Sequence, residues 1–281
     1  MRQVLDTHTH VWNRARHPQG WIDPETMAAI YRDFTLAELE AALGEVGVHE
    51  AIVVQASHAI SETEDILNGA DSAAIVGVVG WVDRESPALA DDLSRLQALP
   101  NGHKLVGIRH LLHVEPDPEW MLRATVSRGL NILAAANLPF DLVIRPDQLV
   151  LASMAVDKNP NVRFVLDHLA KPPIASGDLT RWQHAVRALA ERPNVVAKLS
   201  GLTIEADWVA WTPGQIAAVL TTGLEAFGAS RLMFGSDWPL VRLTGSYAGW
   251  LDTYLEWSEQ LSPAEQSALD SANARQAYGL K

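Results

Sequence analysis

The chain has 281 residues, of which 48% are hydrophobic, so it is long enough for one large α/β barrel or two smaller domains and too apolar to be disordered. Its 34 acidic and 22 basic side chains give a net charge of −12. Because an acidic surface repels phosphate backbones and anionic membranes, we expect no nucleic-acid and no membrane partner. The absence of cysteine excludes a disulfide scaffold, a thiolate metal site and a cysteine nucleophile.

The amino terminus starts almost directly with a strand-like run and lacks the basic and apolar regions of a secretory signal peptide. No window reaches the roughly 18 uninterrupted apolar residues that a transmembrane helix needs. We therefore expect a cytoplasmic protein.

Eight short apolar runs follow one another along the whole chain. They lie at residues 3–8, 50–57, 74–83, 105–110, 131–136, 162–168, 195–201 and 231–237. Most are continuous rather than alternating, which is typical of strands that are buried on both faces of a parallel sheet.

Helical segments separate these runs. Segment 35–47 has leucines at helical spacing and Thr35 as its N-cap, and segment 86–99 starts with Ser86 before a proline, which suits a cap and a first turn. Similar segments lie at 145–160, 177–193 and 212–228. Strands that alternate with helices in this way predict a (β/α)8 TIM barrel, an α/β fold, as one domain over residues 1–281.

The alternative fold is an open, doubly wound sheet. Such a sheet usually has a glycine-rich phosphate loop after its first strand. The first predicted strand runs into DTHTHVWN, which contains no glycine, so the barrel is the better prediction.

Polar residues gather at the ends of the predicted strands, where a barrel carries its chemistry. In chain order they are Asp6, His8, His10, Gln55, Asp83, Arg109, His110, Asn137, Asp141, Asp167, His168, Lys198, Ser200 and Asp237. Because side chains alternate faces along a strand, His8 and His10 point to the same side. Two imidazoles at this spacing can hold one metal ion, such as Zn²⁺, or one substrate group.

His168 and Asp237 each have a structural alternative. His168 follows a buried apolar run, where a core histidine bonded to a carbonyl is also common. Asp237 lies in the turn GSDWP, where an aspartate before a helix can be an N-cap. The position of Asp237 at the end of the last strand fits a functional carboxylate better. We predict that both residues share one site with His8 and His10.

The segments DTHTHVW, GIRH, VLDHLAKP, KLSGL and MFGSDWP, in this order, resemble those of the amidohydrolase superfamily. They are most similar to its sugar-lactonase branch, which contains L-fuconolactone and L-rhamnonolactone hydrolases, with the 2-pyrone-4,6-dicarboxylate lactonases as cousins. The matching segments run from residue 6 to residue 239. The resemblance implies a (β/α)8 barrel that hydrolyses a small lactone, in this branch a sugar-derived aldonolactone.

By position, the resemblance assigns His8 and His10 to the first-strand pair of the superfamily, His168 to the sixth-strand histidine and Asp237 to the eighth-strand aspartate. The resemblance also implies that Arg109 contacts the polar groups of the substrate.

Many binuclear members of the superfamily carry a carboxylated lysine on the fourth strand and a histidine on the fifth. This chain has an arginine and a histidine on the fourth predicted strand and no histidine on the fifth. We therefore expect one zinc ion, held by His8, His10 and Asp237, or no metal at all.

A lactone is a cyclic ester, so its opening needs an activated water, stabilisation of the oxyanion and a proton for the leaving oxygen. We expect Asp237 to take the proton from water and to return it to the ring oxygen, because burial makes a carboxylate a better base. His168 is the second expected catalytic residue. Arg109 offers a planar fork to hydroxyls or a carboxylate, unless it forms a structural salt bridge across the barrel mouth.

Four further residues are weaker candidates for substrate contacts. They are Gln55, His110 and Asp141 for sugar hydroxyls, and Trp238 for stacking on a sugar ring, each with a structural role as the alternative. Lys171 and Lys198 could also enter the pocket, but the sequence does not place them.

Two other functions stay open. One is a zinc-dependent decarboxylase of a small unsaturated or aromatic acid in the same superfamily, and the other is a non-catalytic barrel that binds a ligand. The chain has no G-x-S-x-G motif, Walker loop or G-x-G-x-x-G motif, so a serine hydrolase or a nucleotide cofactor has no support. The oligomeric state stays open too, with a homo-oligomer among the options.

Overall fold

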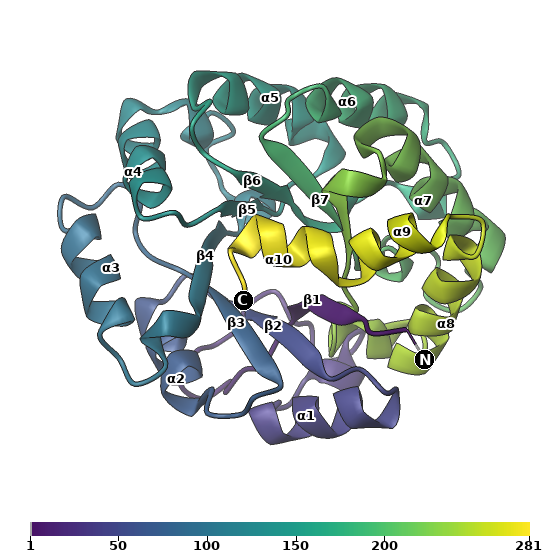
Figure 1. The fold of residues 1–281 in the computed structure, drawn as a ribbon, viewed down its shortest axis with the longest axis horizontal. Helices are drawn as coiled ribbons and strands as arrows, with labels where there is room; N and C mark the ends of the chain where they lie inside the picture. The colour runs from purple at the N-terminus through teal and green to yellow at the C-terminus, as the bar shows by residue number, and fades with distance from the viewer. Residues whose placement is uncertain (1) are drawn as a thin grey trace.

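The structure, a computed structural model, describes residues 2–281. Eight parallel strands pair with their neighbours in chain order, and helices surround them (Figure 1). The strands are β1 (Leu5–Thr9), β2 (Glu50–Val54), β3 (Ile75–Gly80), β4 (Leu105–His110), β5 (Phe140–Leu142), β6 (Phe164–Leu166), β7 (Val195–Leu199) and β8 (Leu232–Phe234). The predicted (β/α)8 barrel is confirmed.

The first and last strands meet and close the sheet. The backbone N–H of Asp237 donates to the carbonyl of His8 at 2.8 Å, and that of His10 donates to the carbonyl of Trp238 at 2.7 Å. Thr9 and Trp238 form a parallel bridge. The closure therefore runs through the segments that carry the predicted site residues of the first and last strands.

Helices cover the outside of the barrel, and apolar side chains between helices and strands form one large core. The helices are α1 (Leu36–Glu45), α2 (Ile60–Gly69), α3 (Leu89–Gln97), α4 (Ala124–Ala135), α5 (Leu149–Lys158), α6 (Thr180–Ala190), α7 (Pro213–Phe227), α8 (Tyr247–Ser258), α9 (Pro263–Ser267) and α10 (Asn273–Tyr278). Within residues 2–281, none of the helices combines the length and the apolar character that crossing a membrane requires.

The predicted helix starts are right in one case and wrong in another. Thr35 caps α1 in a capping box, because its hydroxyl accepts the N–H of Glu38 while the Glu38 carboxylate accepts the N–H of Thr35. Ser86 does not cap α3, which begins at Leu89. The Ser86 hydroxyl instead accepts the N–H of Ala88 at 3.1 Å, so the serine closes a local turn before the helix.

The fifth predicted strand is also wrong. Residues 131–135 belong to α4, in which Leu130 and Leu133 are buried one helical turn apart. The true β5 is only three residues long, Phe140–Leu142. A short apolar run can be a buried helix face as well as a strand, and periodicity alone does not separate the two. As a consequence, Asp141 lies within the strand rather than after it.

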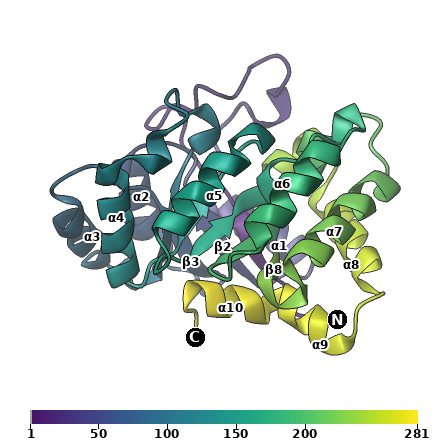
Figure 2. The same ribbon diagram turned by 90° about the horizontal axis from the view of Figure 1, so that it is seen from above.

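The carboxy-terminal helix α10 lies across one end of the barrel (Figures 1 and 2). Its Ala277 and Tyr278 pack in an inner cluster with Leu5 and Val106, which lie in the first halves of their strands. This end is therefore the amino-terminal end of the barrel, and it is closed by side chains. The polar residues that follow the strands lie at the other end.

Candidate active site

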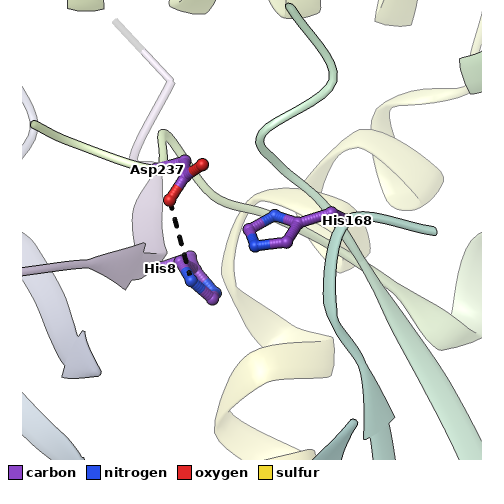
Figure 3. A group of neighbouring side chains, drawn as sticks. All are labelled: His8, His168 and Asp237. Atoms are coloured by element: carbon purple, nitrogen blue, oxygen red, sulfur yellow. Dashed lines mark ion pairs between the residues drawn. The ribbon is translucent and has the colours of Figure 1, made fainter. Parts of the chain in front are cut away.

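The first and last strands bring three side chains together. His8 is on β1, and Asp237 comes after β8 (Figure 3). His10 is the first residue after β1. The Nε2 atoms of His8 and His10 are 3.2 Å apart. Asp237 Oδ1 lies 3.3 Å from Nε2 of His10 and 3.8 Å from Nε2 of His8.

His168 reaches the same place from a turn after β6. Its backbone is left-handed, with φ 54° and ψ 30°, and the next three residues also have positive φ. This turn carries the His168 ring to 4.4 Å from the His8 ring, centroid to centroid, and its Nδ1 to 2.9 Å from the Ser200 hydroxyl. One ligand atom each from His8, His168 and Asp237 lies within 4.8 Å of the others.

Asp6 holds the two ends of the site together. Its Oδ1 accepts the backbone N–H of His8 at 3.0 Å and that of Ser236 at 2.9 Å, and its Oδ2 accepts the hydroxyl of Tyr247 at 2.6 Å. The carboxylate is fully buried, and donors on both oxygens compensate for its lost hydration. Asp6 therefore fixes the register of the His8 and Asp237 segments without facing the site.

Gly201 makes room for the site. Its φ is +61°, and a Cβ atom there would lie 2.5 Å from Nδ1 of His168 and 2.8 Å from Oδ2 of Asp237. Only glycine combines this backbone conformation with so close an approach.

We expect Gly201→Ala to lower kcat at least about tenfold, because the new methyl group must push His168 or Asp237 out of place. The left-handed backbone adds a stability loss of about 1–3 kcal/mol. Gly177→Ala is the matched control, since Gly177 has φ +74° and nothing within 4 Å of the added Cβ. Steady-state kinetics and urea denaturation of both variants check this. Equal kcat values for the two variants would contradict the placement of His168 and Asp237 in the active site.

Arg109 lies beside His8. Its Nη1 is 3.1 Å from Nε2 of His8 and donates to Oδ2 of Asp167 at 3.2 Å, and its Nη2 donates to the carbonyl of Gln55. The guanidinium thus faces the site while it pairs with a buried carboxylate. The Gln55 amide donates to the carbonyl of Arg109 at 3.4 Å, which places Gln55 next to the arginine.

A buried lysine lies beneath His8. The Lys198 ammonium on β7 lies 2.6 Å from Oδ2 of Asp141, 3.0 Å from Oδ1 of Asp167 and 3.2 Å from Nδ1 of His8. Asp141 also accepts the hydroxyl of Tyr278 at 2.7 Å. Asp141 therefore points into the barrel toward α10, and this position argues against the predicted contact with a sugar hydroxyl.

His110 belongs to a separate group beside the site. Its ring is stacked between those of His58 and Trp120, with centroids 4.0 and 4.2 Å away, and its Nε2 lies 3.0 Å from a Glu115 oxygen. Arg84 also hydrogen-bonds to Nδ1 of His110. Both ring nitrogens are thus used within this group.

Trp238 is packed away from the cluster. Its side chain is 3% exposed and meets the Phe34 ring edge to face, with a centroid separation of 5.3 Å. Its backbone carbonyl takes part in barrel closure with His10. This geometry favours the structural alternative, in which Trp238 caps the barrel, over stacking on a sugar ring.

The electrostatics leave the imidazoles neutral and the carboxylate ionised. Burial lowers the pKa of His8 and His10, and it lowers the pKa of His168 to about 4. Burial by itself raises the pKa of Asp237, but His168, His10 and His8 outweigh it, so the net shift is downward. The prediction that burial makes Asp237 a stronger base is therefore wrong.

The cluster fits a metal ion. Asp237 Oδ1 is buried and accepts no hydrogen bond within residues 2–281. Nδ1 of His10 lies 2.7 Å from the carbonyl of Val54, which can only accept, so the lone pair of His10 is on Nε2 and faces Asp237. Ligand atoms of a tetrahedral zinc ion are roughly 3.3–3.6 Å apart. The separations of 3.2, 3.3 and 3.8 Å among His8, His10 and Asp237 are close to this.

From the sequence, Asp167 and Lys198 were predicted only to lie at strand ends, with no role for Asp167 and no position for Lys198. Lys198 did carry a signal, because it interrupts a continuous apolar strand, and a lysine buried there needs a carboxylate partner. Asp167 is adjacent to His168, and strand alternation would send the two to opposite faces. The left-handed backbone at His168 ends the alternation of side chains, and no feature of the sequence predicts this turn.

The chain is thus a (β/α)8 barrel with a group of histidines and an aspartate at the carboxyl ends of its strands, which is where enzymes of this fold carry their active sites. A family model described as amidohydrolase matches residues 5–280, and the chain belongs to this family.

Similar proteins cover almost the whole length of the chain. A protein of Burkholderia ambifaria named L-fucono-1,5-lactonase is 36% identical over 286 residues, which are 98% of this chain and 95% of the relative. One of Burkholderia multivorans with the same name is 36% identical over 98% of this chain and 96% of its own. A crystal structure of a Burkholderia multivorans amidohydrolase with bound Zn has a TM-score of 0.93 at 36% identity, covering 99% of this chain and 100% of that one.

Proposed function

We propose that this protein hydrolyses a sugar-derived lactone, and that the reaction takes place at His8, His10, His168 and Asp237. The two lactonase relatives, 36% identical over 98% of this chain, support the substrate class. The observation that carries the choice of site is the unpartnered Asp237 oxygen, 3.3 Å from Nε2 of His10.

In this proposal the oxygen of a water molecule attacks the lactone carbonyl carbon while Asp237 takes a proton from the water. The carbonyl oxygen becomes an oxyanion, and the bond between the carbonyl carbon and the ring oxygen then breaks. Asp237 returns the proton to the ring oxygen, which becomes a hydroxyl group. The product is a hydroxy acid, which loses its own proton to solvent.

Arg109 places a charged donor 3.1 Å from Nε2 of His8. Its guanidinium is oriented by Asp167, and we assign it the stabilisation of the oxyanion or the binding of a substrate hydroxyl. His168, neutral and held by the Ser200 hydroxyl, is assigned to orient the attacking water beside Asp237.

His8, His10 and Asp237 would hold a divalent cation, with zinc as our candidate. His168 could join them, because one ligand atom each from His8, His168 and Asp237 lies within 4.8 Å of the others. A bound zinc ion polarises the carbonyl and brings the pKa of its water toward about 7. That acidity suits Asp237, because a carboxylate with a lowered pKa is a weak base for ordinary water.

The proposal is tested by mixing the protein with a panel of aldono-1,5- and 1,4-lactones, L-fucono-1,5-lactone included, in a weakly buffered pH indicator. We expect saturable acid release well above spontaneous hydrolysis for at least one lactone. No acid release from any of them, together with carbon dioxide release from a small unsaturated or aromatic acid, would favour the decarboxylase alternative.

Removal of the cation is expected to lower kcat/KM for the lactone at least about 100-fold, which corresponds to about 3 kcal/mol of transition-state stabilisation. The protein is dialysed against a chelator, its metal content is measured by mass spectrometry, and zinc is then added back. We expect zinc to restore activity and magnesium, which prefers oxygen ligands, to fail. Full activity in protein shown to be metal-free would contradict the cation's role.

A further inference from the structure

A second cavity lies at the end of the barrel opposite the candidate active site. Its volume is about 340 Å³, which falls in the range of roughly 300–1,000 Å³ that small-molecule pockets have. The residues that line it come from the starts of β6, β7 and β8 and from α10, the helix that crosses this end of the barrel (Figure 2). The candidate active-site residues lie at the other ends of the strands, so the two cavities are separate.

Two arginines enter this cavity from neighbouring parts of the sheet. Arg163 is the last residue before β6, and Arg231 is the last residue before β8. Only β7 lies between these strands, and neighbouring strands are about 4.8 Å apart, so the two backbone positions are separated by roughly 10 Å. Two long side chains that start this close together can contact one bound molecule from two sides.

Both guanidinium groups are held in place by backbone carbonyls and keep donors to spare. Nη1 of Arg163 donates to the carbonyl of Ala277 at 2.7 Å. Arg231 donates through Nε and Nη1 to three carbonyls that lie 3.0–3.1 Å away. Within residues 2–281, Nη2 of neither arginine donates a hydrogen bond, so each guanidinium still has N–H groups for a ligand.

The positive charge of this cavity has no counterion in the described chain. Within residues 2–281 neither Arg163 nor Arg231 forms an ion pair, whereas the nearby Arg192 pairs with Asp157 at 2.7 Å. No aspartate or glutamate lines the cavity. Burial lowers the pKa of Arg231, and no carboxylate offsets this effect. In a chain with a net charge of −12, two unpaired cations in one cavity reverse the overall sign of the charge. A bound anion would compensate them.

Two guanidinium groups without a counterion match a dianion. A phosphate monoester carries close to two negative charges at neutral pH and offers three strong acceptor oxygens, which guanidinium groups bind in pairs. The cavity is larger than a phosphate group needs, and its neutral polar side chains, Asn161, Asn194, Ser230 and Gln276, suit hydroxyl groups. We propose that this cavity binds a small hydroxylated phosphate monoester, such as a sugar phosphate, with Arg163 and Arg231 on the phosphate group. The proposal does not depend on the activity of the candidate active site.

Isothermal titration calorimetry of the wild-type protein tests the ligand class. The probes are inorganic phosphate, glucose 6-phosphate, gluconate as a monoanion and glucose as a neutral molecule. We expect glucose 6-phosphate to bind with a dissociation constant below about 1 mM, gluconate to bind at least about tenfold more weakly, and glucose not to bind. No binding of either phosphate up to about 10 mM, or gluconate binding as tight as that of the phosphates, would overturn the proposal.

Arg163→Gln tests the place of binding. We expect it to weaken the binding of glucose 6-phosphate at least about tenfold, because it removes one charge and one pair of donors. Arg181→Gln is the matched control, since Arg181 is an exposed arginine on α6 that does not line the cavity, and it should leave the affinity unchanged. Unchanged affinity in Arg163→Gln would place the ligand elsewhere and overturn the proposal.

Ser230→Asp gives a second test that leaves the hydrogen bonds of both arginines intact. Ser230 is exposed and lines the cavity, so a carboxylate there repels an anion and competes for Arg231. We expect a loss of glucose 6-phosphate affinity of at least about tenfold, and no loss in Ser94→Asp, which makes the same change at an exposed serine of α3. Circular dichroism confirms the fold of each variant. Equal affinities of the two serine variants would contradict binding in this cavity.

Discussion

Asp237→Asn is expected to lower kcat for lactone opening about a thousandfold or more. The amide has the size of the carboxylate but cannot take a proton from water, and a positioned general base contributes roughly 10²–10⁴-fold. The change also removes a charge that Nε2 of His10 faces at 3.3 Å, so a bound cation would be held less firmly. Initial rates over a range of lactone concentrations separate the loss in kcat from any change in KM.

Asp252→Asn is the matched control for this variant. Asp252 is an exposed aspartate on α8, and its replacement should leave kcat unchanged. If Asp237→Asn keeps kcat within tenfold of wild type, another group must activate the water, and the assignment of the base is wrong.

Lys198→Met is expected to lower the free energy of unfolding by about 3–5 kcal/mol, because it leaves the buried Asp141 carboxylate without its cation and Asp167 with Arg109 alone. Asp141 and Asp167 both lie within 3.0 Å of the lysine nitrogen and have no exposed surface. Burial already raises the pKa of Asp141 to about 6, and the Lys198 charge holds that rise back. Urea denaturation followed by circular dichroism measures the loss.

Adding Asp141→Asn to Lys198→Met should recover part of that stability, since it removes the carboxylate that has lost its lysine, while Asp167 keeps its ion pair with Arg109. Lys158→Met, on the exposed end of α5, should change the free energy of unfolding by less than about 0.5 kcal/mol. Equal stability of the single and the double variant would show that Asp141 and Lys198 do not interact as the distances indicate.

The barrel could be predicted from the sequence because seven of its eight strands coincide with predicted, mostly apolar runs, and helical patterns separate several of these runs. The remaining strand, β5, was not predicted because it is only three residues long. The more apolar stretch before it forms the end of α4. A segment this short is held by its neighbours: Phe140 pairs with both Ile108 and Phe164. Tertiary pairing of this kind leaves little trace in local sequence.

The candidate site was predictable where strand geometry alone decides it. The alternation of side chains puts His8 and His10 on one side of β1, and the closure of the barrel brings β8, and with it Asp237, next to them. The orientations of Asp141 and Trp238 were not predictable in this way. The orientation of Asp141 depends on a hydrogen bond from Tyr278 of α10. That of Trp238 depends on its contact with Phe34, which is distant in the sequence.

A crystal structure of Asp237→Asn with a bound aldonolactone would show directly whether lactone opening takes place at His8, His10, His168 and Asp237. We expect the lactone at the carboxyl ends of the strands, with its carbonyl carbon beside residue 237 and its carbonyl oxygen within reach of His8 and Arg109. A lactone bound elsewhere on the barrel, with these side chains in contact only with one another, would show that the active site is not here.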